Sequence, residues 1–507
     1  MIVTFTQAEA ATDLHPPLAR ERWTSFIDGE FLAHGAGDVF DVHEPSTGAV
    51  LAQVESADAA VVDAAVASAA RAQRAWGQMS PRERGAVLRQ VADRLRAHAD
   101  ELATLEAREV GKPKRDAGRF DVSFSHAAFE YFAGLGDTLH GEILDQGAIE
   151  ARIVPEPYGV VAAILPFNWP PIHFAKKCAP ALVAGNAVII KPGEQAPLTV
   201  LRMVEIANEV LPPGVLNAVT GMAAGAGLAG HRGVQRITFT GATATGRRVL
   251  QSAAQNLTFA TMELGGKNAL IVLEDADIPQ SVDVAIEGMF YNQGEACTST
   301  ARILVHDAVF DEFVEAFCRK AEALVVGDGL DAATDVGPMV DAKQRDRVLS
   351  YLDTALSEGA RIVAQGTLPD DPALAGGYWV APTVLVDVTP DSTFGQEEVF
   401  GPIAGIMRFT EEDDAIAIAN GTEYGLTAAV CTRDEQRAWR IAQRLDVGMV
   451  FVNNYMRRAF LGSPFGGVKG SGFGRENAAE TLREFVRSKN VRFPSGRAPV
   501  PVWPPVD

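Results

Sequence analysis

Cysteine and histidine are scarce in this sequence. Its 507 residues include four cysteines and nine histidines. The cysteines lie far apart and form no CxxC pair, and no HExxH motif is present. Neither a disulfide framework nor a zinc site is therefore indicated. We expect a protein of a reducing compartment, the cytoplasm, that binds no metal.

Long apolar runs and a surplus of basic residues are also missing. No uncharged apolar run reaches the length of a membrane span. The first residues, MIVTFTQAEAATDLH, lack the basic stretch and following apolar stretch that mark a signal peptide. The formal net charge is −20, whereas phosphate contacts need clustered Lys and Arg. We therefore expect neither nucleic acid nor a membrane as a partner.

The sequence does contain enough apolar material for a large core. Hydrophobic residues make up 47% of the chain, and its length predicts roughly two to four domains. Helical periodicity over 58–79 is followed by a second helix that the capping box Ser80–Glu83 opens. From 159 onward, short apolar runs alternate with amphipathic stretches, as in a doubly wound, mostly parallel sheet. A similar alternation begins near 268, so we expect two α/β units joined near MELGGKN.

Two loops that follow predicted strands could bind a nucleotide. FTGATATG places Gly241 and Gly246 between a strand and a helix, whose free N–H groups suit a phosphate. IIKPGEQAP places Lys191 and Glu194 at a strand's carboxyl end, where an acid can accept hydrogen bonds from both ribose hydroxyls. Neither loop matches a standard fingerprint, because the acid precedes the glycines and arginines follow Gly246. A plain tight turn and a solvated loop are the alternatives.

Asn168 and Glu263 also lie near the ends of predicted strands. In LPFNWPP, Asn168 stands between aromatic residues and could donate its amide N–H to an oxyanion. Alternatively, Asn168 caps the next helix. In TMELGG, Glu263 lies in an apolar strand before a double glycine, where a raised pKa would make it a plausible general base. The alternative is a strand glutamate that faces solvent.

Cys297, in NQGEACTST, lies past the predicted end of a helix at Gly294. The C-terminal end of a helix disfavours an anion, so the helix dipole cannot lower the pKa of this thiol. Activation as a nucleophile would need a nearby cation, backbone N–H groups or a base, and Lys177 is a candidate cation. Core packing is the alternative for a lone cysteine.

Taken in order along the chain, these residues resemble those of the aldehyde dehydrogenase superfamily. The motifs MELGGKN, FTGATATG, NQGEACT, QEEVFGP and SPFGGVKGSGFGRE all match, and the likeness covers nearly the whole chain. The resemblance implies an α/β fold with a Rossmann-like cofactor domain, an α/β catalytic domain and a β-strand oligomerisation arm. We assign 1–135 and 157–265 to the NAD-binding domain, 266–475 to the catalytic domain, and 136–156 with 476–507 to the arm and tail. A homodimer or homotetramer is expected.

The resemblance also implies a mechanism. Cys297 attacks the aldehyde, Asn168 and the Cys297 backbone N–H hold the oxyanion, and NAD accepts the hydride. Glu263 then activates the water that hydrolyses the thioester, and Lys177 is assigned to the same catalytic group. The residues expected at the cofactor are Ile164, Pro166, Phe167, Lys191, Glu194, Gly241, Gly246, Leu264, Glu398 and Phe400.

Departures from the family pattern bear on the ligands. Ala242 stands where the family often has serine, so one hydroxyl contact to the pyrophosphate is lost. The residues expected at the substrate are Phe124, Trp169, Thr298 and Arg458. The aromatic side chains Phe124 and Trp169, with Phe167 added, favour an apolar or aromatic aldehyde. Arg457 and Arg458 leave open a carboxylated semialdehyde, although a solvent-facing pair is the favoured interpretation of these arginines.

Two other functions compete with a hydrolytic dehydrogenase. A CoA-acylating enzyme must protect its thioester from water and typically lacks the glutamate that this chain has at Glu263. A catalytically silent binding or structural protein on the same scaffold tends to lose the nucleophile or the cofactor residues, and here all are present.

The cofactor should be NAD rather than NADP. An ionised Glu194 accepts hydrogen bonds from the ribose hydroxyls, whereas a 2′-phosphate would meet like charge. That repulsion costs of the order of a few kcal/mol in a poorly solvated site. Lys191 partly offsets it, so some NADP activity is expected. The measurement is kcat/KM for both cofactors in the parent and in Glu194→Ser; a parent that prefers NADP, or an unchanged ratio in the variant, would contradict the assignment.

Overall fold

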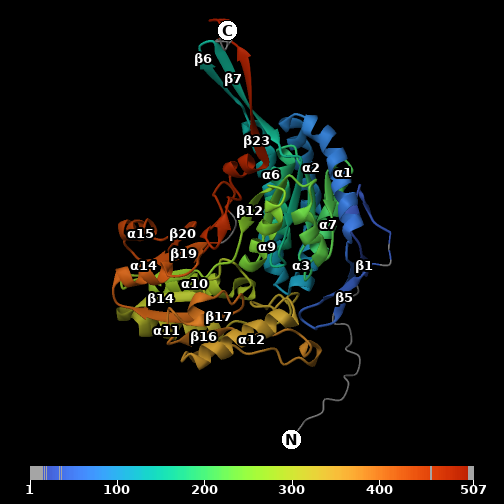
Figure 1. The fold of residues 1–507 in the computed structure, drawn as a ribbon. Coiled ribbons are helices and arrows are strands. Elements are labelled where there is room, and N and C mark those ends of the chain that lie inside the picture. The colour runs from blue at the N-terminus through green and yellow to red at the C-terminus, as the bar shows by residue number, and fades with distance from the viewer. Residues whose placement is uncertain are drawn as a thin grey trace.

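The computed structural model describes residues 15, 18, 20–33, 35, 37–456 and 460–500. Figure 1 shows two α/β bodies packed side by side and a thin β-ribbon that projects from one of them. Over the described residues, no helix combines the length and the hydropathy needed to cross a bilayer.

Eight strands form the first sheet. They are β2 (Phe26–Ile27), β3 (Glu30–Phe31), β8 (Val160–Ile164), β9 (Ala187–Lys191), β10 (Leu216–Ala218), β11 (Arg236–Thr240), β12 (Phe259–Glu263) and β22 (Gly472–Phe473). Their order is β22-β12-β11-β8-β9-β10-β2-β3. The run from β12 to β10 is parallel, as the sequence predicts, and short antiparallel strands close both edges. Because β22 comes from near the C-terminus, the chain returns to this sheet after building the second one.

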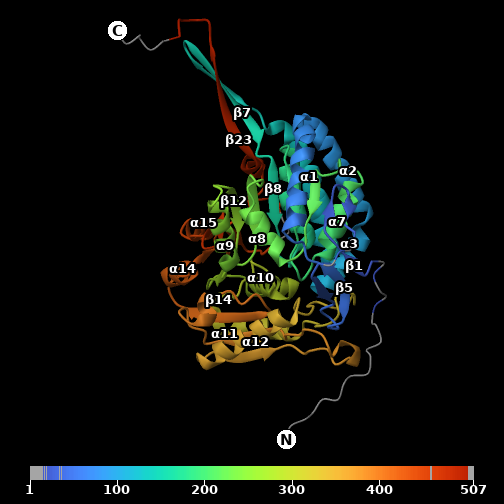
Figure 2. The same ribbon diagram turned by 45° about the vertical axis from the view of Figure 1, so that its right-hand side comes forward.

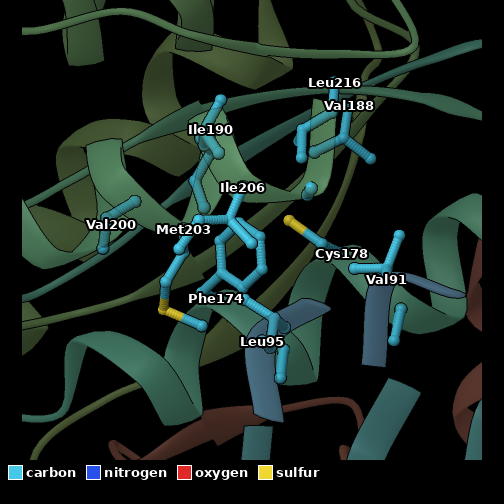
Figure 3. Packing of buried hydrophobic residues seen from close by; sticks show 14 of the residues in the cluster. Val91, Leu95, Phe174, Cys178, Val188, Ile190, Val200, Met203, Ile206 and Leu216 are labelled. Atoms are coloured by element: carbon cyan, nitrogen blue, oxygen red, sulfur yellow. The ribbon is translucent and has the colours of Figure 1, made fainter. Parts of the chain in front are cut away.

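Helices cover both faces of the first sheet. They are α1 (Ala59–Gln78), α2 (Pro81–Ala97), α3 (Ala99–Val110), α5 (Ser123–Leu135), α6 (Pro170–Val183), α7 (Leu198–Asn208), α8 (Met222–Gly230) and α9 (Thr243–Ala254). The predicted capping box is confirmed, since Ser80 and Glu83 bond reciprocally at the start of α2. Successive strand residues point to opposite faces. In β9, Val188 and Ile190 pack with α2, α6 and α7 (Figure 3), whereas Ala187 and Ile189 pack with α1, α8 and α9.

The second sheet has seven strands. They are β13 (Ala269–Val272), β14 (Arg302–His306), β15 (Arg361–Gln365), β16 (Thr383–Val386), β17 (Ile403–Phe409), β19 (Thr427–Cys431) and β20 (Met449–Val452). The order is β15-β16-β17-β14-β13-β19-β20, and only β15 is antiparallel to its neighbour. The helices of this body are α10 (Ile278–Phe290), α11 (Phe310–Glu322), α12 (Ala342–Ser357), α13 (Thr393–Gln396), α14 (Glu412–Asn420) and α15 (Glu435–Ala442). The alternation of strands and helices predicted from the sequence missed the strands β17 and β19.

The projecting ribbon is a three-stranded antiparallel sheet of β6 (Glu142–Gln146), β7 (Ile149–Pro157) and β23 (Val486–Pro494). It extends away from both bodies in Figures 1 and 2. These strands lie where the sequence predicts the arm. The segment 476–485 was also assigned to the arm, but it packs on the first body, because Leu482 and Phe485 belong to the core of that body.

The remaining elements are short. A further sheet joins β1 (Arg22–Trp23), β4 (Val39–His43) and β5 (Val50–Glu55), and β18 (Tyr424–Gly425) pairs with β21 (Val468–Lys469). A one-turn helix α4 (Lys114–Asp116) leads into a π-helical turn at Ala117–Val122. The 3-10 turns are Gly136–Thr138, Tyr291–Gly294, Asp307–Val309, Pro372–Leu374 and Ala479–Phe485.

Candidate active site

Parallel strands bring the predicted site residues to one edge of the first sheet. Strand β8 ends just before Asn168, β9 ends at Lys191, β11 ends before Gly241, and β12 ends at Glu263. The carboxyl ends of parallel strands share an edge, which is where such sheets bind ligands. Cys297 reaches the site from the second body, in the loop before β14.

The turn before Cys297 has a left-handed backbone. Helix α10 ends at Phe290, and Asn292, Gln293 and Gly294 follow with φ of 53°, 47° and 72°. The α-helix therefore ends earlier than the predicted end at Gly294, because left-handed residues cannot continue it. Each such non-glycine residue costs about 1–3 kcal/mol and persists only where its surroundings fix it.

Buried side chains fix this turn. Asn292 Nδ2 donates to the carbonyl oxygens of Asn168 (3.2 Å) and Glu295 (3.0 Å). Gln293 Nε2 donates to Glu295 Oε2 (2.9 Å) and to the Val110 carbonyl (3.2 Å). The result is a rigid base for the cysteine loop, which Asn268 Nδ2 also holds through the Cys297 carbonyl (2.8 Å).

The three cysteines other than Cys297 are poorly suited to act as nucleophiles. Cys297 and Cys318 are partly exposed, whereas Cys178 and Cys431 are buried. Burial raises the pKa of Cys178 well above its usual value and that of Cys431 to about 11, and burial also raises the pKa of Cys318 to about 11. A raised pKa leaves little thiolate at neutral pH, so these three are poor nucleophiles. Core packing, the alternative considered for Cys297, applies instead to Cys178, which Figure 3 shows between α2 and the first sheet.

The amide of Asn168 is held in one orientation. Its Nδ2 donates to the Glu295 carbonyl at 2.9 Å, and its Oδ1 lies 3.2 Å from His173 Nε2. Burial, with Lys176 and Lys177 nearby, holds the pKa of His173 well below its usual value, so the neutral ring donates from Nε2 to the amide oxygen. One N–H of the Asn168 amide is thus used, and the second is available. The alternative, an N-cap for α6, is wrong because Trp169 occupies that position and no side chain caps the helix.

Glu263 is buried, with 2% of its surface exposed. Neither of its carboxylate oxygens has a hydrogen-bond partner among the described residues. Burial, followed by the charge of Glu476, raises the pKa of Glu263 well above its usual value, and Lys176, Lys177 and Arg475 oppose that rise. The solvent-facing alternative is therefore wrong, and a buried carboxyl with a raised pKa suits a general base.

Lys177 lies near enough to Glu263 to influence its pKa, and it forms an ion pair with Glu476. Its Nζ donates to Glu476 Oε1 at 2.8 Å and to Thr238 Oγ1 at 3.0 Å, and the side chain is fully buried. Lys176 Nζ lies 2.9 Å from the other oxygen, Glu476 Oε2. Although burial opposes it, these two ammonium groups hold the pKa of Glu476 far below its usual value. The structure thus places Lys177 in an ion pair with Glu476, a partner that the sequence analysis did not identify.

The predicted cofactor residues form two neighbouring groups. In the first, Lys191 and Glu194 form an ion pair, and burial lowers the pKa of Lys191. A Cβ at Gly193 would lie only 2.9 Å from the Phe167 nitrogen, so this loop packs directly on the segment of Pro166 and Phe167. Ile164, at the end of β8, is buried behind both.

Helix α9 offers an open N-terminus beside this group. Gly241 precedes its N-cap, Ala242, and no side chain caps the helix or places an acid in its first turn. Gly246 faces Leu264, since a Cβ at Gly246 would lie 2.5 Å from Leu264 Cδ2. The absence of a side chain at Gly246 lets the helix pack closely against the residue that follows β12.

The second group is Glu398 with Phe400. Glu398 Oε1 accepts a hydrogen bond from the Gly266 amide at 2.9 Å, and burial raises the pKa of Glu398 to about 7. Phe400 has a left-handed φ of 64°, and its ring packs edge-on against Phe167 at 5.9 Å. Phe167 therefore packs with the expected cofactor residues, and it is not among the residues that line the cavity described below.

A cavity of about 230 Å³ is bordered by Trp169, the residue that follows Asn168. Phe124 and Trp169 line it, as the sequence predicts, together with Phe120, Tyr291 and Phe465. Thr298 does not line it; that residue is buried, and its carbonyl accepts a hydrogen bond from the Tyr455 hydroxyl at 2.5 Å. Arg457 and Arg458 lie outside the described residues.

The sequence analysis missed several residues of this site. Lys176 lines the cavity, His173 orients Asn168, and Glu476 binds both lysines. Glu476 ends the motif SPFGGVKGSGFGRE, so a signal for it was present. No local pattern marked His173 or Lys176, because both lie on a helix that is buried along its whole length.

The fold and the site together define an α/β protein whose candidate cofactor residues gather at one edge of a parallel sheet, with a partly exposed cysteine supplied by the second body. The sequence matches the model of the "Aldehyde dehydrogenase family" over residues 32–491. It is 44% identical to aldehyde dehydrogenase citD of Monascus ruber over 98% of each chain, and 40% identical to a betaine aldehyde dehydrogenase of Agrobacterium fabrum over 96% of this chain and 99% of that one. PnpE from Pseudomonas sp. WBC-3 superposes with a TM-score of 0.91 at 42% identity, over 95% of this chain and 99% of PnpE. The chain belongs to the aldehyde dehydrogenase family.

Proposed function

We propose that this protein oxidises an apolar or aromatic aldehyde to the carboxylic acid with NAD, and that it releases the acid by hydrolysis. The observation that carries the hydrolytic part is Glu263, a buried carboxyl with both oxygens free of hydrogen bonds and a raised pKa. The aromatic walls of the cavity support an apolar or aromatic substrate.

The described residues fit a dinucleotide. The uncapped start of α9 suits the pyrophosphate, and Glu194 suits the adenosine ribose. Glu398 and Phe400 would hold the nicotinamide ribose and ring, with Pro166 and Phe167 packed beside them. Two solved relatives, PnpE and a betaine aldehyde dehydrogenase from Staphylococcus aureus, contain nicotinamide adenine dinucleotide. When bound, this cofactor supplies the hydride acceptor.

In the first half of the reaction, Cys297 Sγ forms a bond to the aldehyde carbon. The carbonyl oxygen becomes an oxyanion, which needs preorganised donors in a site with little water. The second N–H of the Asn168 amide and the Cys297 backbone N–H are the donors that we assign to it. Loss of hydride then leaves a thioester on Cys297.

In the second half, Glu263 takes a proton from a water molecule, and the hydroxide attacks the thioester carbon. The carbon–sulfur bond breaks, and Cys297 leaves as a thiolate while the acid is released. The charges of Lys176, Lys177 and Arg475 favour the ionised form of Glu263, whereas burial and the charge of Glu476 oppose it. A CoA-acylating reaction is disfavoured, because a buried base beside the thioester promotes hydrolysis.

The arm supports a homo-oligomer. Ile143 and Leu144 of β6 are exposed, at 67% and 44%, on a ribbon that has no core of its own. Exposed apolar side chains on such a ribbon are typical of a surface that another subunit covers. We therefore propose a homodimer or a homotetramer.

Replacing Asn168 with alanine should lower kcat by roughly a hundredfold, because one oxyanion donor is lost. The measurement is steady-state NADH formation at saturating aldehyde. A variant in which only KM changes would show that Asn168 binds the ground state or serves the structure.

Cys297→Ala should abolish aldehyde oxidation while NAD binding, measured by calorimetry, is retained. Cys318→Ala is the matched control, since Cys318 is also partly exposed but its pKa is raised to about 11. Turnover near the parent rate in Cys297→Ala, or loss of turnover in Cys318→Ala alone, would overturn the assignment of the nucleophile.

Glu263→Gln should slow hydrolysis more than hydride transfer, because an amide cannot take a proton from water. Stopped-flow measurements should show a burst of at most about one NADH per site, followed by slow turnover. In the parent, the hydrolytic rate should rise with pH through a pKa well above that of an ordinary glutamate, since only the ionised form is a base. Full steady-state activity in the variant would remove Glu263 from the mechanism.

A further inference from the structure

Lys176 brings an ammonium group to the wall of the substrate cavity. Lys176 lies on α6, four residues after Ile172, so the two side chains share one face of the helix. Both line the cavity together with Trp169. The Lys176 side chain is only 4% exposed, and its Nζ stands 3.9 Å from the centre of the Phe465 ring. Five of the other lining residues are aromatic.

The charge of Lys176 is only partly compensated. Lys176 and Lys177 share one carboxylate, Glu476, whose Oε1 accepts the well-aligned hydrogen bond from Lys177. Lys176 lies 2.9 Å from Oε2, and among the described residues Glu476 is the one acid within ion-pair distance of either ammonium group. The raised pKa of Glu263 favours its protonated form, and a protonated Glu263 does not balance the second ammonium. Two cations therefore face one anion, in a place with little water.

The other charged groups at the cavity do not supply the missing anion. Asp121 is bound to Lys112, and Glu106, the other carboxyl that Lys112 contacts, has a pKa raised well above its usual value by burial and by Asp121. That cluster is therefore neutral overall when Glu106 is protonated. Arg119 and Glu287 also line the cavity but are exposed, where water screens their charges.

We propose that Lys176 binds an anionic oxygen on the substrate, so that the preferred aldehydes carry a carboxylate on an aromatic or other apolar frame. A desolvated ammonium with unused N–H donors gains most from a charged acceptor. The aromatic walls would by themselves also suit a cationic substrate through cation–π contacts, but Lys176 repels a second cation. This inference rests on the proposed function, because it takes the cavity to be the place where the aldehyde binds.

The test compares acids with their uncharged esters in the parent enzyme. The probes are 2-, 3- and 4-carboxybenzaldehyde, each paired with its methyl ester, and betaine aldehyde as the cationic probe. At least one acid should exceed its ester in kcat/KM by roughly ten- to hundredfold, which is the range for a hydrogen bond to a charged group, and betaine aldehyde should be poor. A parent that favours every ester over its acid, or that prefers betaine aldehyde, would overturn the proposal.

Variants then assign the preference to Lys176. Lys176→Met should reduce the acid-to-ester ratio to near one, and Lys176→Arg, which keeps the charge, should retain most of it. Arg119→Met is the matched control, because it removes a cation from the exposed part of the same cavity. If kcat/KM falls equally for acid and ester in Lys176→Met, Lys176 acts through Glu476 and Glu263 instead. If the acid-to-ester ratio falls only in Arg119→Met, the preference is due to another residue than Lys176.

A binding measurement separates this inference from the proposed function. Calorimetry of the best acid and its ester with Cys297→Ala, with and without Lys176→Met, needs no turnover. Tighter binding of the acid that depends on Lys176 supports the inference even if no aldehyde is oxidised, in which case the proposed function alone fails. Equal binding of acid and ester would overturn the inference while oxidation of the ester still supports the proposed function.

Discussion

The buried ion pairs of Glu476 join the end of the chain to the core of the first body. Strand β22 (Gly472–Phe473) pairs with the end of β12, and three residues after it Glu476 contacts Lys176 and Lys177 on α6. Removing one partner of a buried pair costs about 3–5 kcal/mol, because a charge is left without compensation. This contact fixes the C-terminal segment against the first sheet, and with it the environment of Glu263 and one wall of the cavity.

The cysteine loop depends on a second, independent set of contacts. The left-handed turn at Asn292 and Gln293 is unfavourable in isolation, and it is held by hydrogen bonds to Asn168 and to the buried Glu295. The same Glu295 carbonyl orients the Asn168 amide. The cysteine loop and the Asn168 amide are thus positioned by one network of hydrogen bonds, so that a change in either one disturbs both. Rigid positioning of this kind is what a preorganised oxyanion site requires.

Much of the fold could be predicted from the sequence, and the failures have physical causes. Strands β8, β9 and β11 were found because each is a short apolar run with turn residues on both sides. Strands β17 and β19 were missed, although they are equally buried, because runs such as TAAVC are rich in small residues and do not stand out from a helix pattern. The two-residue strand β1 was missed because its partner, β5, is distant in the sequence, and no local pattern indicates such pairing.

The sequence by itself determined which residues are the candidates for the chemistry and which of them share a sheet edge. Cys297, Glu263 and Asn168 lie in motifs, and strand alternation sends Asn168 and Glu263 to the carboxyl edge of one parallel sheet. Only the tertiary structure decided how the charges are paired. Lys177 is bound to Glu476, and Lys176 faces the cavity, because a segment about 300 residues away along the chain returns to α6. Contacts of that separation depend on the packing of whole domains, and a local pattern of residues carries no record of them.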